Sequence, residues 1–298
     1  MIISPSAISP YKIPTFQSGG VGFLGLLDEY PNAAAAYSVR RLSSTYTGNL
    51  IEVRRTVSAV TVTADVSFDS NNELSLDSEI LVTGGSSNAT NLGEFVAAAG
   101  YSDPDSLGSG QNAFVRTWYD QSGNANNAQQ TTTSRQLNIV QSGVINTLNS
   151  IACVNTDGID DGFICSVPSS SVFNSYYALE NNDTQYLYPN SGGINFGFVG
   201  QSGNFSASTN LYGTPSFYAN GILSPSSNRN EVYLSGNGYK LIVHENANTS
   251  LWGGSIELFY YPSFVAQIKV QEIIFYNTDQ SANRTGIESN INSYYSIY

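Results

Sequence analysis

Between residues 113 and 277 the sequence consists of short apolar runs separated by clusters of asparagine, glycine, serine and proline. Such runs occupy residues 113–119, 150–155, 163–167, 194–200, 216–222, 240–245, 255–261 and 269–277. Valine, isoleucine and aromatic residues are frequent in them, and these side chains favour strands. Many short strands with turns between them are typical of sandwiches and barrels. The sequence therefore predicts an all-β, antiparallel jelly-roll sandwich with a few short helices.

The N-terminal half predicts two helices and two strands. Residues 31–44 predict a helix, because a proline opens the segment, four alanines follow, and two arginines lie near its end. Residues 50–57 and 60–68 alternate with period two and predict strands. Residues 91–100 predict a short helix that ends at a glycine.

The last strand carries apolar side chains on both of its faces, so both faces must be covered. Thr278 or Asp279 can cap a helix directly after it. In that helix Ile287, Ile291 and Tyr294 fall at helical spacing. We therefore expect the C-terminal helix to cover one face of the strand and to belong to the core.

Charge and hydropathy exclude two classes of partner. Charged residues make up 11% of the chain and the formal net charge is −12, so no basic face for nucleic acid is expected. No segment approaches the ~18 consecutive apolar residues of a membrane helix, so we expect no membrane insertion. The N-terminus lacks the basic start and long apolar core of a signal peptide, and we expect a chain made in the cytoplasm and not exported by the ordinary route.

Residues 1–20 form a proline-rich segment that ends in Gly19-Gly20. Such a segment is extended and buries little by itself, which leaves two interpretations. It is either a solvated tail or an arm that orders against a partner, and its apolar residues are too many for a plain tail. We expect an extended arm over 1–20 and a single jelly-roll domain over 21–298.

A long polar stretch, Thr117–Gln130, follows the first of the strands. Asp and Asn side chains bond to the backbone two residues on, and glycine accepts a positive φ, so the stretch predicts an elaborate turn. A cation or sugar site is the alternative, because carboxylate and amide oxygens suit Ca²⁺. The candidate structural motif comprises Trp118, Tyr119, Asp120, Gln121, Ser122, Gly123 and Asn124.

Other candidate groups are few. Asp157, Asp160 and Asp161 are the best candidates for Ca²⁺ ligands by their local density, although their spacing is not that of an EF-hand. No other cofactor is indicated, and no metal can be assigned from the sequence.

Histidine and cysteine give no catalytic signature. A Ser-His-Asp triad would have to use His244, the only histidine, which we interpret as a strand residue at a surface or edge. No Gly-x-Ser-x-Gly or Walker loop is present. Cys153 and Cys165 are either a disulfide or two buried free thiols, and the thiols are the better interpretation.

Two family resemblances run through these segments. Residues 114–130 ("FVRTWYDQSGNANNAQQ"), 143–163 and 269–298 resemble the laminin-G-like, concanavalin A-like jelly-roll domains of bacteriophage virion proteins. Residues 36–55 ("AYSVRRLSSTYTGNLIEVRR") resemble the start of the α-L-arabinofuranosidase B catalytic domain, which also has a Tyr-Asp-Gln-Ser-Gly-Asn segment. The resemblance covers residues 33–298 and is weak over 170–230. The resemblance is specific evidence for the fold but weak evidence for the activity, because these motifs are turns of the scaffold.

The enzyme resemblance implies a vicinal Cys-Cys pair, a Glu nucleophile and an Asp acid/base. No two cysteines are adjacent here, and neither carboxylate can be placed in the divergent region. Glycosidases need two carboxylates across a cleft, and spacing alone selects no pair. We therefore assign no catalytic residue.

The virion resemblance leads to the first functional expectation. It is a bacteriophage virion structural protein, as a capsid decoration, head-fibre or tail-fibre subunit located in the virion. Its expected partners are other virion proteins through the arm, copies of itself as a homo-oligomer, and host surface glycans. The alternatives are a glycoside hydrolase of the α-L-arabinofuranosidase type, acting on arabinose-containing polymers, and a free non-catalytic lectin.

Overall fold

The computed structural model describes residues 22–182, 185–190, 197–201, 213–251, 254–261, 264–265 and 267–298. Its strands are β1 (Ala35–Ser38), β2 (Ile51–Val57), β3 (Val60–Val66), β4 (Ile80–Gly84), β5 (Ala113–Trp118), β6 (Ala128–Gln129), β7 (Asn138–Gln141), β8 (Val144–Ile145), β9 (Thr147–Leu148), β10 (Ile151–Ala152), β11 (Val154–Asn155), β12 (Phe163–Cys165), β13 (Phe173–Asn181), β14 (Gln185–Asn190), β15 (Gly197–Gln201), β16 (Ser216–Ala219), β17 (Ile222–Leu223), β18 (Gly238–Ala247), β19 (Ile256–Leu258), β20 (Tyr260–Tyr261), β21 (Phe264–Val265) and β22 (Ile268–Tyr276). Its helices are α1 (Leu26–Glu29), α2 (Leu92–Phe95), α3 (Arg229–Gly236), α4 (Arg284–Tyr295) and the 3₁₀ turn η1 (Thr133–Arg135).

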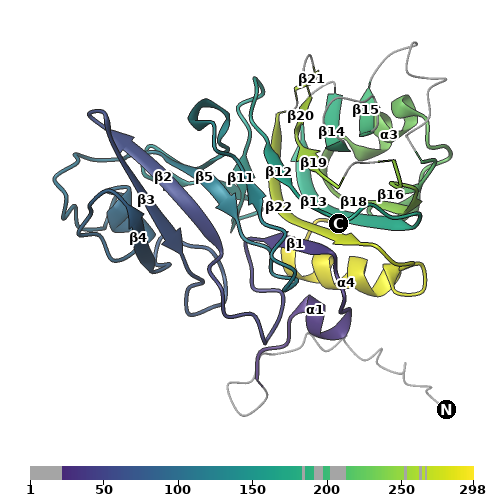
Figure 1. Cartoon of the computed structure of the whole chain (residues 1–298), viewed down its shortest axis with the longest axis horizontal. Coiled ribbons are helices and arrows are strands. Elements are labelled where there is room, and N and C mark those ends of the chain that lie inside the picture. Colours follow the sequence, from purple (N-terminus) through teal and green to yellow (C-terminus); the bar gives the residue numbers. More distant parts are fainter. Residues whose placement is uncertain are drawn as a thin grey trace, which may run out of the picture.

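Antiparallel pairing orders the strands into two layers. In one layer β17, β16, β18, β13, β22 and β1 pair in that order. In the other, β4, β3, β2, β5 and β7 pair in that order. Figure 1 shows β2, β3 and β4 on one side of the molecule and β13, β18 and β22 on the other.

A chain of aromatic rings fills the space between the layers. Trp118 on β5 lies 6.1 Å from Tyr37 on β1, between ring centroids, and 6.2 Å from Phe163 on β12. Tyr37 lies 6.3 Å from Phe275 on β22, which lies 5.4 Å from Phe173 on β13. All five side chains are buried. The expected all-β antiparallel sandwich with a few short helices is thereby confirmed.

The helix expected over residues 31–44 is wrong. Residues Ala35–Ser38 form β1, which pairs along its whole length with β22, from Ala35↔Phe275 to Ser38↔Glu272. Every residue of β1 is buried. Alanine favours a helix only locally, and the pairing with a distant, fully buried strand outweighs that preference.

The other expected elements of the N-terminal half are present. The strands expected over 50–57 and 60–68 are β2 and β3, and the short helix expected within 91–100 is α2. The first three residues of the strand expected over 194–200 lie outside the described residues, and so does the whole of the expected arm over 1–20.

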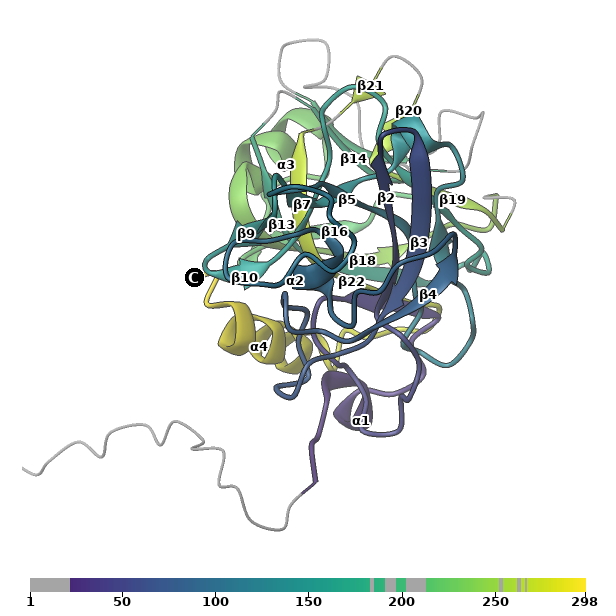
Figure 2. The same cartoon turned by 90° about the vertical axis from the view of Figure 1, so that its left-hand side faces the viewer.

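Helix α4 covers the outer face of β22, as expected for the C-terminal segment. Ile287, Ile291 and Tyr295 are buried, so the last buried position is Tyr295 and not Tyr294. The Tyr295 hydroxyl donates to Glu272 of β22 at 3.0 Å. Figure 2 shows α4 and α1 together on this side of the molecule. Strand β22 therefore has the interlayer core on one face and α4 on the other.

Candidate functional site

Asp120 organises the polar loop that follows β5. Its Oδ1 accepts hydrogen bonds from the N–H groups of Ala36 at 2.8 Å and Ser122 at 2.9 Å. Its Oδ2 accepts from the Ser122 hydroxyl at 2.8 Å and from the N–H of Asn126 at 3.0 Å. Each carboxylate oxygen therefore has two donors, and the side chain is only 4% exposed. This carboxylate is committed to holding the loop on β1.

Gln121 makes the second connection between this loop and the N-terminal segment. Its amide nitrogen donates to the carbonyls of Ser38 at 3.2 Å and Arg40 at 3.0 Å. Its amide oxygen accepts from the N–H of Leu42 at 2.8 Å. A buried amide with these three partners fixes the register of both segments.

The aromatic residues of the motif have different environments. Trp118 is completely buried, and its indole N–H donates to the carbonyl of Ser38 at 3.3 Å. Tyr119 is half-buried, and its hydroxyl donates to Asp65 at 2.6 Å. Burial is the largest cause that raises the pKa of Tyr119 above its ordinary value, and the hydrogen bond to Asp65 adds to it. Both side chains act as structural anchors.

The exposed end of the motif is a tight turn. Gly123 has a φ of +88°, a conformation that residues with a Cβ rarely adopt. The Asn124 amide donates to the carbonyl of Ala33 at 2.8 Å, and the Asn126 amide donates to that of Ala34 at 2.8 Å. Asp120, Gln121 and these two amides therefore use their polar atoms to connect the turn to β1.

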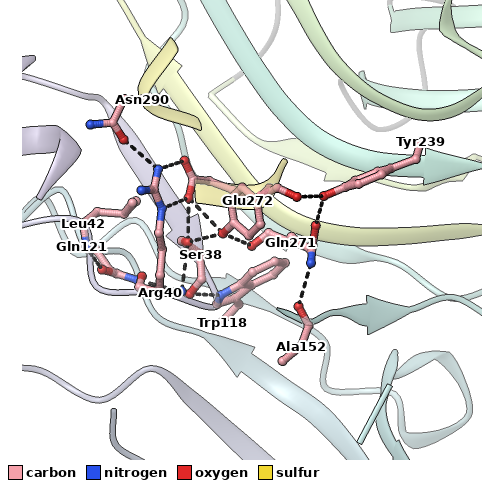
Figure 3. Close-up of polar contacts among 11 residues, drawn as sticks. Ser38, Arg40, Leu42, Trp118, Gln121, Ala152, Tyr239, Gln271, Glu272 and Asn290 are labelled. Atoms are coloured by element: carbon pink, nitrogen blue, oxygen red, sulfur yellow. Dashed lines mark hydrogen bonds and ion pairs between the residues drawn. The ribbon is translucent and has the colours of Figure 1, made fainter. Parts of the chain in front are cut away.

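A buried ion pair extends this network to the C-terminal strand (Figure 3). The Arg40 guanidinium binds Glu272 through Nε at 2.8 Å and through Nη2 at 3.1 Å. The Ser38 hydroxyl donates to Glu272 at 2.8 Å, and Arg40 also donates to Asn290 of α4 at 3.0 Å. Burial lowers the pKa of Arg40, but the adjacent Glu272 carboxylate raises it above its ordinary value. The guanidinium therefore stays charged inside the protein.

Sequence reasoning missed this ion pair. Arg40 and Glu272 are separated by 232 positions, and Arg40 was expected near the end of a helix. Glu272 lies in an otherwise apolar strand. This is the one local feature of the sequence that indicates an ion pair, because a buried carboxylate requires a partner.

A polar pocket of about 520 Å³ opens beside the turn. We call it the loop pocket. Its walls come from residues 27–33, 43–48 and 121–124, so the turn at Gly123 forms one side of it. Hydroxyl and amide side chains dominate the lining, and Tyr46 adds an aromatic ring. The volume lies within the range of small-molecule sites, which is roughly 300–1,000 Å³.

Two side chains set the electrostatics of the loop pocket. Burial raises the pKa of Asp28, but hydrogen bonds from the N–H groups of Gly25 and Ser44 and from nearby hydroxyls lower it below its ordinary value. Burial raises the pKa of Tyr46 to about 12, and the charges of Asp120 and Asp65 add to the effect. At neutral pH the pocket therefore has one carboxylate, held by its own donors, and a neutral phenol.

The three aspartates proposed as Ca²⁺ ligands lie together. Carboxylate oxygens of Asp157, Asp160 and Asp161 are all within 4.8 Å of one another. Asp161 accepts from the N–H of Asp157 at 2.9 Å, and Asp157 accepts from the N–H of Ile159 at 2.8 Å. The grouping exists in the structure, and binding of Ca²⁺ stays a prediction.

Two carboxyl groups near Arg135 have raised pKa values. Burial raises the pKa of Asp161 to about 7, and the charges of Asp157 and Asp160 add to the effect while Arg135 opposes it. Burial also raises the pKa of Glu257 on β19, again against the effect of Arg135. No sequence pattern joins Glu257 to the acidic loop, because β12 and β19 are far apart along the chain and pair only in the fold.

His244 lies in the core, and its interpretation as a surface or edge residue is wrong. Strand β18 pairs with β13 on one side and β16 on the other, so it is a central strand. The imidazole Nδ1 lies 3.1 Å from the Ser175 hydroxyl, and burial lowers its pKa to about 3. A fully buried histidine of this kind does not reach a substrate.

Both cysteines are free and buried, which agrees with the thiol interpretation. Burial raises the pKa of both Cys153 and Cys165 to about 12. A thiol with so high a pKa is a poor nucleophile at neutral pH.

No family model and no curated protein matches the chain. Three solved structures resemble it, and all are arabinofuranosidases. They are a GH54 α-L-arabinofuranosidase soaked with a cyclic sulfate inhibitor (14% identity, TM-score 0.41), a mutant GH54 enzyme soaked with 4-nitrophenyl α-L-arabinofuranoside (14%, 0.43), and an arabinofuranosidase complexed with arabinofuranosyl-α-1,2-xylobiose (16%, 0.36). Each match covers 88% of this chain and 62% of the other, so this chain spans less than two thirds of those proteins.

The expectation of a bacteriophage virion structural protein is corrected by this comparison. These three matching structures are arabinofuranosidases and none is a virion protein, and no family match supports the laminin-G-like assignment. At these identities and TM-scores, function has to be argued from the residues of this chain. In the described part of the chain, no helix is long and apolar enough to cross a membrane.

Proposed function

We propose that this chain binds carbohydrate in the loop pocket. The observation that supports the proposal is the pocket itself, about 520 Å³ in volume and lined mainly by hydroxyl and amide groups around Tyr46. Hydroxyls and amides can both donate to and accept from sugar hydroxyls, and a tyrosine ring offers an amphipathic surface for a sugar. The sequence resemblance to the arabinofuranosidase B catalytic domain suggests arabinose-containing polymers as the first ligands to test.

Thr45 and Thr47 give the sharpest test, because both line the loop pocket and are exposed. Titration calorimetry with arabino-oligosaccharides should show saturable binding to the native chain. Replacing both threonines by alanine should weaken binding at least about fivefold, since two hydroxyls at roughly 0.5–1.5 kcal/mol each are lost. Thr131→Ala removes an exposed threonine outside the pocket and should bind as the native chain does. Equal affinity of all three proteins would contradict the proposal.

Hydrolysis of a glycoside is the second candidate function, and it rests on a different observation. Asp161 has a pKa of about 7, which suits a general acid at neutral pH. Glu257 is a second carboxyl group near the same Arg135. Glycosidases use such a pair, one carboxyl group protonating the leaving oxygen and the other acting as base or nucleophile.

Release of nitrophenol from 4-nitrophenyl α-L-arabinofuranoside separates the two functions. If the chain is a hydrolase, Asp161→Asn and Glu257→Gln should each reduce kcat by at least about a hundredfold, within the range for acid-base groups. Asp77→Asn removes an exposed carboxyl group outside this loop and serves as the control. Binding of arabino-oligosaccharides without turnover would leave glycan recognition as the function.

A further inference from the structure

A second polar cluster lies between the sheet and α4, away from the loop pocket. It comprises Tyr176 on β13, Tyr218 on β16, Glu245 on β18, and Arg284 and Glu288 on α4. We call it the helix–sheet cluster. The Arg284 guanidinium lies 2.8 Å from Glu288 and 3.5 Å from Glu245. It also lies over the ring of Tyr218, 3.9 Å from the centroid, and the Tyr218 hydroxyl donates to Glu245 at 3.2 Å.

The helix–sheet cluster has two carboxyl groups, Glu245 and Glu288, whereas Arg284 is the one cation that acts on Glu288, Tyr176 and Tyr218 among the described residues. The two carboxyl side chains are 8% and 4% exposed. Burial raises the pKa of Glu288, and Arg284 opposes this effect. An excess negative charge in so buried a place is costly unless a proton or a cation neutralises it.

Three oxygen atoms of this cluster have no hydrogen-bond partner among the described residues. They are Oε1 of Glu245, which forms the 3.5 Å ion pair with Arg284 Nε, Oε1 of Glu288 and the hydroxyl oxygen of Tyr176. The Tyr176 side chain is completely buried, and the charges of both glutamates act on its hydroxyl. Buried polar atoms without a partner are rare in native proteins, and each points to an occupant that satisfies it.

We propose that the helix–sheet cluster binds one alkali-metal cation through these three oxygen atoms. Oxygen ligands without nitrogen or sulfur select hard cations. A single positive charge neutralises the excess charge of −1, whereas a divalent cation would leave the buried site with an excess of +1. The cation would join two sheet strands to α4, and so it would stabilise the packing of the C-terminal helix.

The helix–sheet cluster approaches the surface at the turn between β16 and β17. Gly221 in this turn has no side chain, and an added Cβ would lie 3.6 Å from the Tyr298 hydroxyl and 3.7 Å from Oε2 of Glu288. Tyr298 is 54% exposed. We expect an ion to enter at this turn.

Thermal and urea unfolding as a function of sodium concentration tests the proposal. The native chain is unfolded at pH 7.5 in mixtures of NaCl and choline chloride of constant ionic strength, with EDTA present to remove divalent ions. Above the dissociation constant, the unfolding equilibrium constant should fall tenfold for each tenfold rise in sodium, because one ion is released on unfolding. Choline is too large to enter and provides the reference.

Tyr176→Phe and Glu288→Gln should abolish this sodium dependence. Tyr176→Phe keeps the ring and removes one ligand atom, so it preserves the fold even if Glu288→Gln fails to fold. Asp157→Asn with Asp160→Asn changes the other acidic group and should keep the full dependence. An unfolding equilibrium that is independent of sodium in the native chain would overturn the proposal, and so would an unchanged dependence in Tyr176→Phe.

Discussion

At the scale of single residues, the polar side chains after β5 serve as internal connections. Asp120, Gln121, Asn124 and Asn126 each bond to backbone groups of residues 33–42 or of the loop itself. Backbone groups buried by a long loop need such partners, because water cannot reach them. This loop therefore has a structural role, and it forms one wall of the loop pocket.

Asp120→Ala should destabilise the protein strongly. The change removes an acceptor of four hydrogen bonds and leaves the N–H groups of Ala36 and Asn126 without a partner. Hydrogen bonds to charged groups are worth about 1.5–3 kcal/mol each in net terms, so loss of the bonds to these two N–H groups alone should cost roughly 3–6 kcal/mol. Urea unfolding measures it, and Asp69→Ala, in an exposed loop, is a comparison. A loss below about 1 kcal/mol would show that the loop does not depend on this carboxylate.

His244 should make the protein less stable in acid. Its pKa is about 3 when folded and 6.5 in the unfolded chain, so the unfolded state binds the proton first as the pH falls. This contribution to stability is complete above pH 6.5 and is lost progressively toward pH 3. Between pH 7 and pH 5 it amounts to about 2 kcal/mol, from about 1.4 kcal/mol per unit.

The pH dependence of urea unfolding, measured for the native chain and His244→Gln, checks this prediction. Glutamine does not titrate, so the variant should lose about 2 kcal/mol less than the native chain between pH 7 and pH 5. Identical slopes for the two proteins would mean that His244 titrates normally in the folded state.

At the scale of elements, local patterns in the sequence predicted most strands but could not predict β1. Period-two alternation identifies β3, which exposes one face in part, and β2, whose polar side chains are themselves largely buried. Strand β1 is buried throughout and rich in alanine, and its sequence resembles a helix. Its partner β22 is more than 230 positions away, and the secondary-structure propensities of neighbouring residues cannot predict such a pairing. The same distance hid the Arg40–Glu272 ion pair, and shorter separations along the chain hid the helix–sheet cluster.

Deleting residues 286–298 should prevent stable folding. Helix α4 buries Ile287, Ile291 and Tyr295 against the sheet, and burial is worth about 1.5–3 kcal/mol for each large side chain. The loss is comparable with the total stability of a domain, roughly 5–15 kcal/mol. The truncated chain should aggregate or lack a cooperative unfolding transition in calorimetry.

A shorter deletion of residues 297–298 controls for the loss of the chain end, because α4 ends at Tyr295. This variant should stay folded, with a melting temperature close to that of the native chain. If the longer deletion also melts normally, α4 does not contribute to the core.

At the scale of the whole molecule, the sandwich carries its candidate sites in separate places. The loop pocket lies between α1 and the turn after β5, the acidic loop precedes β12, and the helix–sheet cluster lies under α4. The sequence located the acidic loop and the turn that forms one wall of the loop pocket, because polar residues cluster locally in turns. The walls of the pocket come from three separate segments, so its existence follows only from the fold.

The central proposal for this protein is that a glycan binds in the loop pocket. A crystal structure of the chain grown with an arabino-oligosaccharide tests this claim most directly. We expect the sugar in contact with Thr45, Tyr46 and Thr47, with the turn at Gly123 beside it and the bonds of Asp120 unchanged. A sugar bound instead between Asp161 and Glu257, or an empty loop pocket at saturating ligand, would contradict the account.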